Sequence, residues 1–141
     1  MTIKIQYHAD ITPIEQKKAS DWIDLRAAET VAIRQGEAKK ISLGISMELP
    51  EGYEAYILPR SSTFDTYGLV VTNSEGVIDN AYSGPEDIWK LSLYATRNTV
   101  VNKDDRICQF RIMPKQPKID FVEINELDNP NRGGFGSTGI Q

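Results

Sequence analysis

The sequence has a single cysteine and lacks long apolar runs, and both shortages narrow the possible functions. Cys108 has no partner for a disulfide within the chain, and its apolar neighbours indicate a buried, unreactive thiol, which fits a reducing compartment. Charged side chains interrupt the segment from Lys4 to Lys18, so it lacks the apolar core of a signal peptide or a membrane span. We therefore expect a cytoplasmic protein with no membrane partner.

The chain also lacks an excess of basic charge. Its formal net charge is -4 and its pI is near 5.0, which leaves no basic face for a nucleic-acid backbone. We therefore expect no nucleic-acid partner. The composition does not exclude a phosphorylated small molecule, because a few arginines and a metal ion bind phosphate whatever the overall charge.

Alternation of apolar and polar residues is the clearest pattern in the sequence. From Ile41 to Leu49 every second side chain is apolar, which predicts one half-buried strand. Nothing resembles a long amphipathic helix, and residues 12–18 have room for a turn or two of helix at most. These features predict an all-β fold, a jelly-roll-like sandwich or barrel. Shorter strands are predicted at 3–7, 31–33, 53–58, 90–94, 106–113 and 119–124.

Length and C-terminal composition predict one domain followed by an arm. A chain of 141 residues is long enough for one sizeable core. We place the β domain at residues 1–128. Residues 129–141 are too rich in glycine and proline to hold a strand, so we expect an arm that is mobile when nothing is bound.

Three polar patches carry groups that bind phosphate or support a metal ion. After a predicted strand, Arg60 stands beside the hydroxyls of Ser61 and Ser62, a combination that suits phosphate oxygens but is also typical of a solvated loop. Gln109 follows a charged turn and is a second ligand candidate. Asp24 lies on a predicted strand, where it would either support the water shell of a metal or make a salt bridge with a neighbouring strand.

Two further patches have the composition of a nucleotide site. Residues 72–84 are predicted to form a hairpin with Asn73, Asp79 and Tyr82 near its mouth. Asp79 would orient a water and Tyr82 would offer a flat surface to a sugar, unless these residues only form the turn. Residues 132–139 combine a cation, an aromatic ring and two hydroxyls, and no Walker sequence follows them.

Taken together and in this order, the patches resemble the motifs of the trimeric dUTPase family. The resemblance runs from about residue 21 to residue 139. The stretches that carry it are Pro59-Arg60-Ser61-Ser62 with Tyr67-Gly68-Leu69, the segment from Asn73 through Gly76-Val77-Ile78-Asp79 to Tyr82-Ser83-Gly84, Asp105-Arg106-Ile107-Cys108-Gln109, and Gly134-Phe135-Gly136-Ser137-Thr138-Gly139.

The resemblance implies a jelly-roll-like homotrimer that hydrolyses dUTP to dUMP and pyrophosphate with the help of Mg²⁺. It implies active sites at the subunit interfaces, each assembled from all the chains, and no second protein partner. Such an activity limits the incorporation of uracil into DNA and supplies dUMP for thymidylate synthesis.

The same resemblance implies roles for individual side chains. Asp79 corresponds to the base that deprotonates the attacking water, and Asp24 corresponds to an outer-shell partner of Mg²⁺. The uracil and sugar contacts are the Asn73 amide, the backbone at Gly76 and Ile78, and the Tyr82 ring. The phosphate contacts are Arg60, Ser61, Ser62 and Gln109, and the arm adds Arg132, Phe135, Ser137 and Thr138, of which Phe135 stacks on the base.

Two positions depart from the family pattern. Asp21 and Trp22 stand where the first motif has a small pair of residues, so a large ring occupies that place. In the last motif, Arg132 is closer to Phe135 than the family spacing, so either the arm takes another path or a different arginine supplies the cation.

Two other functions compete with this interpretation. The dCTP deaminase family shares the arginine-serine-serine loop and the trimer, but it needs a glutamate on the strand after the hairpin, and residues 89–94 contain no acid. The second alternative is a β-sandwich interaction module that uses a nucleotide pocket to gate a partner surface. The presence of Asp79 favours hydrolysis and leaves a regulatory role open.

Overall fold

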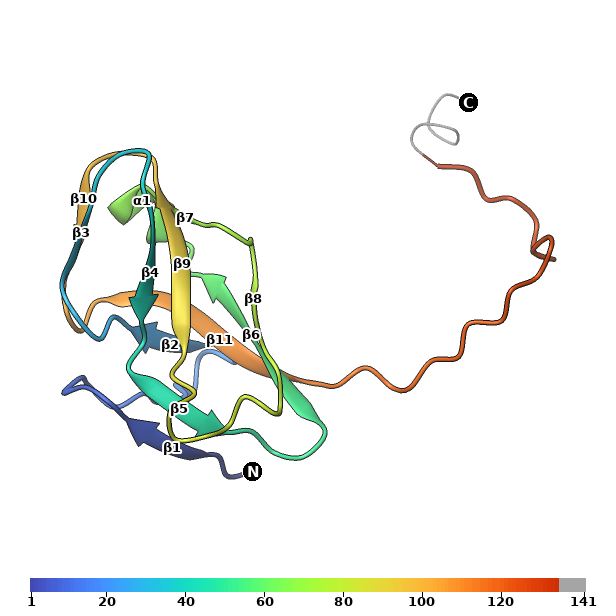
Figure 1. Ribbon diagram of the computed structural model, residues 1–141, viewed down its shortest axis with the longest axis horizontal. Helices are drawn as coiled ribbons and strands as arrows, with labels where there is room; N and C mark the ends of the chain where they lie inside the picture. The colour runs from blue at the N-terminus through green and yellow to red at the C-terminus, as the bar shows by residue number, and fades with distance from the viewer. Residues whose placement is uncertain (135–141) are drawn as a thin grey trace.

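The computed structural model describes residues 1–134, which form short strands and one helix (Figure 1). Within that range, no helix is long and apolar enough to cross a membrane. The elements are β1 (Lys4–Tyr7), β2 (Ile23–Arg26), β3 (Val31–Ile33), β4 (Ala38–Ser42), β5 (Ile45–Glu48), β6 (Tyr53–Pro59), α1 (Thr63–Tyr67), β7 (Leu69–Val71), β8 (Gly76–Ile78), β9 (Lys90–Ala95), β10 (Thr99–Val101) and β11 (Arg106–Pro114).

The strands pair antiparallel in two larger sheets and two ribbons, which confirms the all-β prediction. The four-stranded sheet has the order β2-β11-β6-β8 and the three-stranded sheet the order β4-β9-β7. In the ribbons, β1 pairs with β5 and β10 pairs with β3. Strands far apart in the sequence are therefore neighbours, and β11 lies between β2 and β6 (Figure 1).

The core joins the two larger sheets through an aromatic pair. Trp89 immediately precedes β9 and Phe110 lies on β11, and their rings meet edge to face with centroids 5.2 Å apart. Both side chains are buried, together with aliphatic residues of either sheet such as Ile57 and Leu93. Cys108 is also fully buried, and burial raises the pKa of its thiol, so the prediction of a buried thiol is confirmed.

Residues 41–49 form two strands, and the prediction of one continuous strand is wrong because the backbone turns at Gly44. Gly44 has a φ of 67°, and a Cβ at this position would lie 2.9 Å from the Cβ of Ala28. Only glycine adopts this positive φ without strain and also avoids the clash with Ala28. β4 therefore ends at Ser42 beside β9, and β5 begins at Ile45 beside β1.

Residues 119–124 do not form the predicted strand, because no strand of the described chain pairs with them. After β11 the chain leaves the body and runs outward (Figure 1). Phe121 and Val122 are 92% and 81% exposed. The apolar pattern was recognised correctly, but the partner that a strand needs is missing from residues 1–134.

Residues 72–84 do not form a paired hairpin either. The strand before this segment, β7, pairs with β9, whereas β8 pairs with β6 in the other sheet. The segment therefore crosses from one sheet to the other. The reason is that Val71 and Leu69 face the core against β9, while Gly76 approaches Ile57 on β6 so closely that a Cβ would lie 3.3 Å from the Ile57 side chain.

We predict that Phe110→Ala lowers the free energy of unfolding by about 3–5 kcal/mol, because it removes a buried ring and leaves a cavity against Trp89. Urea unfolding at fixed protein concentration measures the change. Val100→Ala is the control, since Val100 is 50% exposed and its truncation should cost less than about 1 kcal/mol. Equal losses for the two variants would contradict this description of the core.

Candidate active site

A cluster of polar side chains gathers where β2, β6 and β11 meet. Arg60 follows the last residue of β6, and its Nε donates to Asp24 Oδ1 at 3.0 Å. The other carboxylate oxygen of Asp24 lies 3.5 Å from Arg106 Nη1. Gln109 stands opposite Asp24 in the register of β2 and β11. The structure thus brings together Asp24, Arg60 and Gln109, which the sequence placed in separate patches.

The loop that carries Arg60 is held by Thr63, a residue that is not among the predicted phosphate contacts. Thr63 is 1% exposed; its Oγ1 accepts from the backbone N–H of Arg60 at 2.9 Å and donates to the carbonyl of Ile107 at 3.1 Å. α1 begins at this residue and ends at Tyr67, and its C-cap residue, Gly68, has a φ of 67°. The hydroxyl of Ser62 lies 3.4 Å from Arg60 Nη1. Ser61 is exposed in the same loop.

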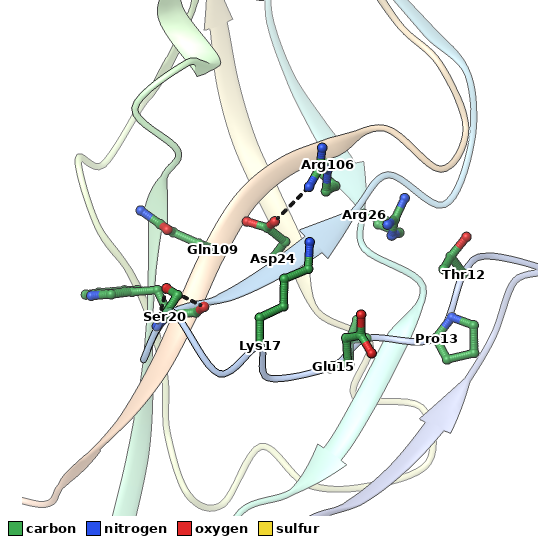
Figure 2. A pocket seen from close by; sticks show the side chains of 11 residues that line it. Thr12, Pro13, Glu15, Lys17, Ser20, Asp24, Arg26, Arg106 and Gln109 are labelled. Atoms are coloured by element: carbon green, nitrogen blue, oxygen red, sulfur yellow. Dashed lines mark hydrogen bonds and ion pairs between the residues drawn. The ribbon is translucent and has the colours of Figure 1, made fainter.

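A pocket beside this cluster is lined by charged side chains of both signs, among them Glu15 and the half-buried Asp24 of β2. Figure 2 shows the side chains of Lys17, Arg26 and Arg106 directed to the same pocket as Asp24. Trp22 also lines it, and the guanidinium carbon of Arg111 lies 5.5 Å from the centre of the Trp22 ring. The large ring at this position therefore has a stacking partner and borders the Asp24 side of the pocket.

A second pocket, of about 450 Å³, contains the predicted base and sugar contacts. Its lining includes Asn73, Gly76, Ile78, Asp79 and Tyr82. The Tyr82 hydroxyl donates to the carbonyl of Ile88 at 2.9 Å, and the Tyr82 N–H donates to the carbonyl of Asp79 at 3.0 Å. These bonds fix the turn that follows Asp79, whose side chain is exposed in the single chain.

Two lysines that the sequence analysis missed also line the second pocket. Lys40 lies on β4 and Lys90 lies on β9, and both precede a buried apolar residue. The alternation of these strands predicts that both lysines face outward, since a residue next to an inward side chain faces outward. What the sequence did not reveal was that the outward face of β4 and β9 borders the segment that carries Asp79.

The two groups of side chains are separated within one chain. Ile78 stands opposite Ala55 in the register of β8 and β6, and Arg60 lies five residues after Ala55, just beyond the end of β6. A strand advances roughly 3.3 Å per residue, so this separation is about 16 Å. The structure therefore does not bring Asp79 together with Arg60 and Gln109 inside a single subunit.

Of the predicted arm contacts, Arg132 lies within the described residues, and it is joined to neither group. Arg132 is exposed on the segment that runs away from the body (Figure 1). Phe135, Ser137 and Thr138 lie outside the described residues, so their predicted contacts stay predictions.

The model of one protein family, described as dUTPase, matches residues 7–139. The chain belongs to the dUTPase family. The matched range contains both groups of side chains, and it also contains α1 and every strand from β2 to β11. The resemblance inferred from the motifs is confirmed.

Proteins of the dUTPase family in bacteria are similar to this chain over nearly its whole length. The SPbeta prophage-derived deoxyuridine 5'-triphosphate nucleotidohydrolase YosS of Bacillus subtilis (strain 168) is 54% identical over 142 residues, which cover 100% of both proteins. The deoxyuridine 5'-triphosphate nucleotidohydrolase of Hydrogenobaculum sp. (strain Y04AAS1) is 43% identical, with 92% of this chain and 90% of that protein covered.

Solved dUTPase structures share the fold. A mutant dUTPase from phage phi11 of S. aureus, described with a structural Mg(II) ion, superposes with a TM-score of 0.77 at 20% identity, covering 90% of this chain and 100% of that one. The Staphylococcus bacteriophage 80alpha dUTPase with dUPNHPP gives a TM-score of 0.77 at 21% identity, covering 99% of each chain. At this level of identity the likeness establishes the fold alone.

In this dUTPase-family chain we predict that Tyr67 makes stability depend on alkaline pH. Its hydroxyl donates to Asp105 Oδ2 at 2.9 Å, and burial followed by this bond raises its pKa from 10.0 to about 12. The folded state favours the neutral phenol, so this stabilisation is complete below pH 10 and is lost between about pH 10 and pH 12.

Unfolding free energies measured across that pH range test the prediction. Tyr67→Phe should lose stability near neutral pH and should show a shallower decline above pH 10 than the wild type. Tyr94→Phe, at a position 41% exposed, is the matched control and should keep the wild-type decline. Parallel pH profiles for wild type and Tyr67→Phe would show that the bond to Asp105 does not contribute.

Proposed function

We propose that the chain hydrolyses dUTP to dUMP and pyrophosphate. The observation that carries the proposal is the pocket in which Asp79 lies beside Asn73, Gly76 and Tyr82, within the range matched by the dUTPase family. The similar bacterial proteins are named for the same activity. In a cytoplasmic setting, this reaction would limit uracil incorporation into DNA and supply dUMP for thymidylate synthesis.

Uracil and deoxyribose occupy the second pocket in this proposal. The Asn73 amide and the backbone of Gly76 and Ile78 offer donors and acceptors to the edge of the base. The Tyr82 ring packs against the sugar where a 2′-hydroxyl would stand, which disfavours ribonucleotides. The bonds of Tyr82 to Ile88 and to Asp79 support this role, because they hold the ring at the pocket while part of it is exposed.

Asp79 acts as the general base. Its carboxylate orients a water, takes a proton from it, and so directs an in-line attack on the α-phosphorus with pyrophosphate as the leaving group. Proton transfer of this kind contributes typically ~10²–10⁴-fold. The exposure of the Asp79 side chain in one chain supports this role, since the carboxylate is open to a bound water and a substrate.

The phosphate contacts are Arg60, Ser61, Ser62 and Gln109. The ion pair of Arg60 with Asp24 supports this role, because it keeps the guanidinium beside the pocket in the absence of substrate. On binding, Arg60 would exchange its bond to the carboxylate for bonds to phosphate oxygens.

The residues around Asp24 fit a Mg²⁺ ion carried in by the triphosphate. Asp24 is a single carboxylate with arginines on both oxygens, which suits a hydrogen-bond acceptor for metal-bound water better than a direct ligand. When bound, the ion would neutralise charge on the phosphates and on the leaving pyrophosphate. Asp24 would orient the water shell of that ion from the β2 side of the pocket.

The active sites are assembled from several chains of a homotrimer. The separation of about 16 Å between the Asp79 region and Arg60 along β6 supports this, because a water attacking the α-phosphorus must lie close to the phosphate contacts. A second support is the outward segment after β11, in which Phe121, Val122 and Leu127 are exposed. We propose that this apolar segment packs on a neighbouring copy of the chain.

The C-terminal arm, residues 129–141, closes over the site in the assembled enzyme. Its departure from the β domain at 1–128 supports this, since the described part of the arm points away from its own body (Figure 1). Phe135 would stack on the base, and Arg132, Ser137 and Thr138 would reach the β- and γ-phosphates.

We predict that the protein with Mg²⁺ releases pyrophosphate from dUTP and acts little on dTTP, dCTP or UTP, because the second pocket recognises uracil and Tyr82 covers C2′. Asp79→Asn should lower turnover roughly 10²-fold or more and retain binding of a non-hydrolysable dUTP analogue, since an amide cannot take the proton. A nucleotide panel with pyrophosphate detection measures both. Ammonia released from dCTP, or single phosphate from dUTP, would refute the proposal.

Subunit mixing tests the shared site. We predict that Asp79→Asn and Arg60→Ala chains are each nearly inactive, but that trimers refolded from an equal mixture regain roughly a quarter of the wild-type turnover, because about a quarter of the sites then combine the intact Asp79 of one chain with the intact Arg60 of another. The control is Asp79→Asn mixed with itself, which should stay inactive. If the mixture recovers nothing while native mass spectrometry shows mixed trimers, both residues act within one chain.

A further inference from the structure

Where β8 ends, hydrogen bonds from the side chain of Asn80 stand in place of the backbone pairing between β8 and β6. Ile78, the last residue of β8, stands opposite Ala55, so continuation of the register would set Asn80 opposite Tyr53. No backbone pair forms there between the two strands. Instead, Asn80 Nδ2 donates to the carbonyl of Tyr53 at 2.9 Å and to the carbonyl of Pro50 at 2.8 Å. One amide thus satisfies two backbone acceptors.

Both acceptors belong to a turn that is itself fixed. The Tyr53 N–H donates to the carbonyl of Pro50 at 3.1 Å, and the Lys115 N–H donates to the carbonyl of Gly52 at 2.8 Å. Gly52 has a φ of 83°, which glycine adopts without strain. The turn between β5 and β6 is therefore tied to the end of β11, and it gives Asn80 a rigid support.

Asp79 lies between two fixed neighbours as a result. On one side, Ile78 is paired to β6, and on the other side the amide of Asn80 is held by the turn. The carbonyl of Asp79 accepts from the Tyr82 N–H at 3.0 Å. The backbone of Asp79 is thus restrained from both directions, while its side chain reaches into the pocket.

We propose that Asn80 is a positioning residue for hydrolysis, which holds the backbone of Asp79 so that the carboxylate meets the attacking water. The inference rests on the proposed role of Asp79 as the base. A displacement of about 1 Å in a reacting group can cost roughly 10²-fold in rate, so two short bonds next to the base have a large effect on turnover. Asn80 itself does not line the pocket that contains Asp79.

The first test separates turnover from binding. Asn80→Ala should lower kcat by roughly 10-fold to 100-fold, while the affinity for the non-hydrolysable analogue α,β-imido-dUTP changes by less than about threefold, because Asn73, Gly76 and Ile78 keep their places. Asn98→Ala is the matched control: Asn98 Oδ1 accepts from the Gln35 N–H at 2.8 Å in an exposed loop. This variant should keep the wild-type kcat. A kcat for Asn80→Ala within about twofold of wild type would overturn the inference.

The second test is a double-mutant cycle with Asp79→Asn. If Asn80 acts through the base, Asn80→Ala should lower the residual turnover of Asp79→Asn by less than about twofold, since no base remains to be positioned. A further loss as large as in the wild type would assign Asn80 a purely structural role and overturn the inference. Should Asn80→Ala fail to fold, Asn80→Ser, which retains one donor, replaces it in both tests. Full turnover of Asp79→Asn alone would instead refute the proposed base.

Discussion

The pairing of β11 with both β2 and β6 is the interaction on which the cluster of Asp24 with Arg60 and Gln109, the proposed phosphate contacts, depends. Because β11 lies between the other two strands, Gln109 stands opposite Asp24 on one side and opposite Leu58 on the other. A shift of one residue in either register would turn Gln109 toward the core and move Asp24 away from Arg60. The buried side of the same strand, with Cys108 and Phe110, fixes that register by packing.

A register shift in β11 adds a second arginine to the cluster at Asp24. The register of β2 and β11 shifts between Arg106 and Cys108, and Arg106 reaches the second oxygen of Asp24. Thr63 links the loop of Arg60 to the neighbouring residue Ile107. The backbone thus places the guanidinium groups of Arg60 and Arg106 at the Asp24 carboxylate, although the net charge of the chain is -4. The proposed binding of phosphate therefore depends on the local placement of these arginines and not on the net charge of the chain.

The sequence predicted those parts of the fold that depend on local alternation, and it failed where distant contacts decide. The limits of β3 and the position of β6, β9 and β11 follow from period-two patterns. The split at Gly44 does not, because it depends on how close Ala28 approaches. Residues 119–124 have the pattern of a strand but no partner among the described residues, and a pattern cannot supply one.

The same division holds for the site. Asp24, Arg60, Asn73, Asp79, Tyr82 and Gln109 are predicted from their residue types, and the order of their patches along the chain resembles a known family. The sequence analysis did not predict the positions of Thr63, Lys40 and Asn80 around the site, because these positions depend on residues far away in the sequence. Asn80 shows the limit most clearly: an Asp-Asn pair reads as a turn, and only the carbonyls of Pro50 and Tyr53 reveal the second function of its amide.

One strand, β6, connects the two ends of the proposed reaction. Its first residue, Tyr53, accepts from Asn80 beside Asp79, and its last residue, Pro59, precedes Arg60. In the proposed trimer these two ends serve different active sites, so the length of β6 sets the distance between a base in one site and a phosphate clamp in another. Its pairing with β8 and β11 keeps that distance constant. In the proposed trimer, β6 would therefore couple the spacing of neighbouring active sites through its pairing alone.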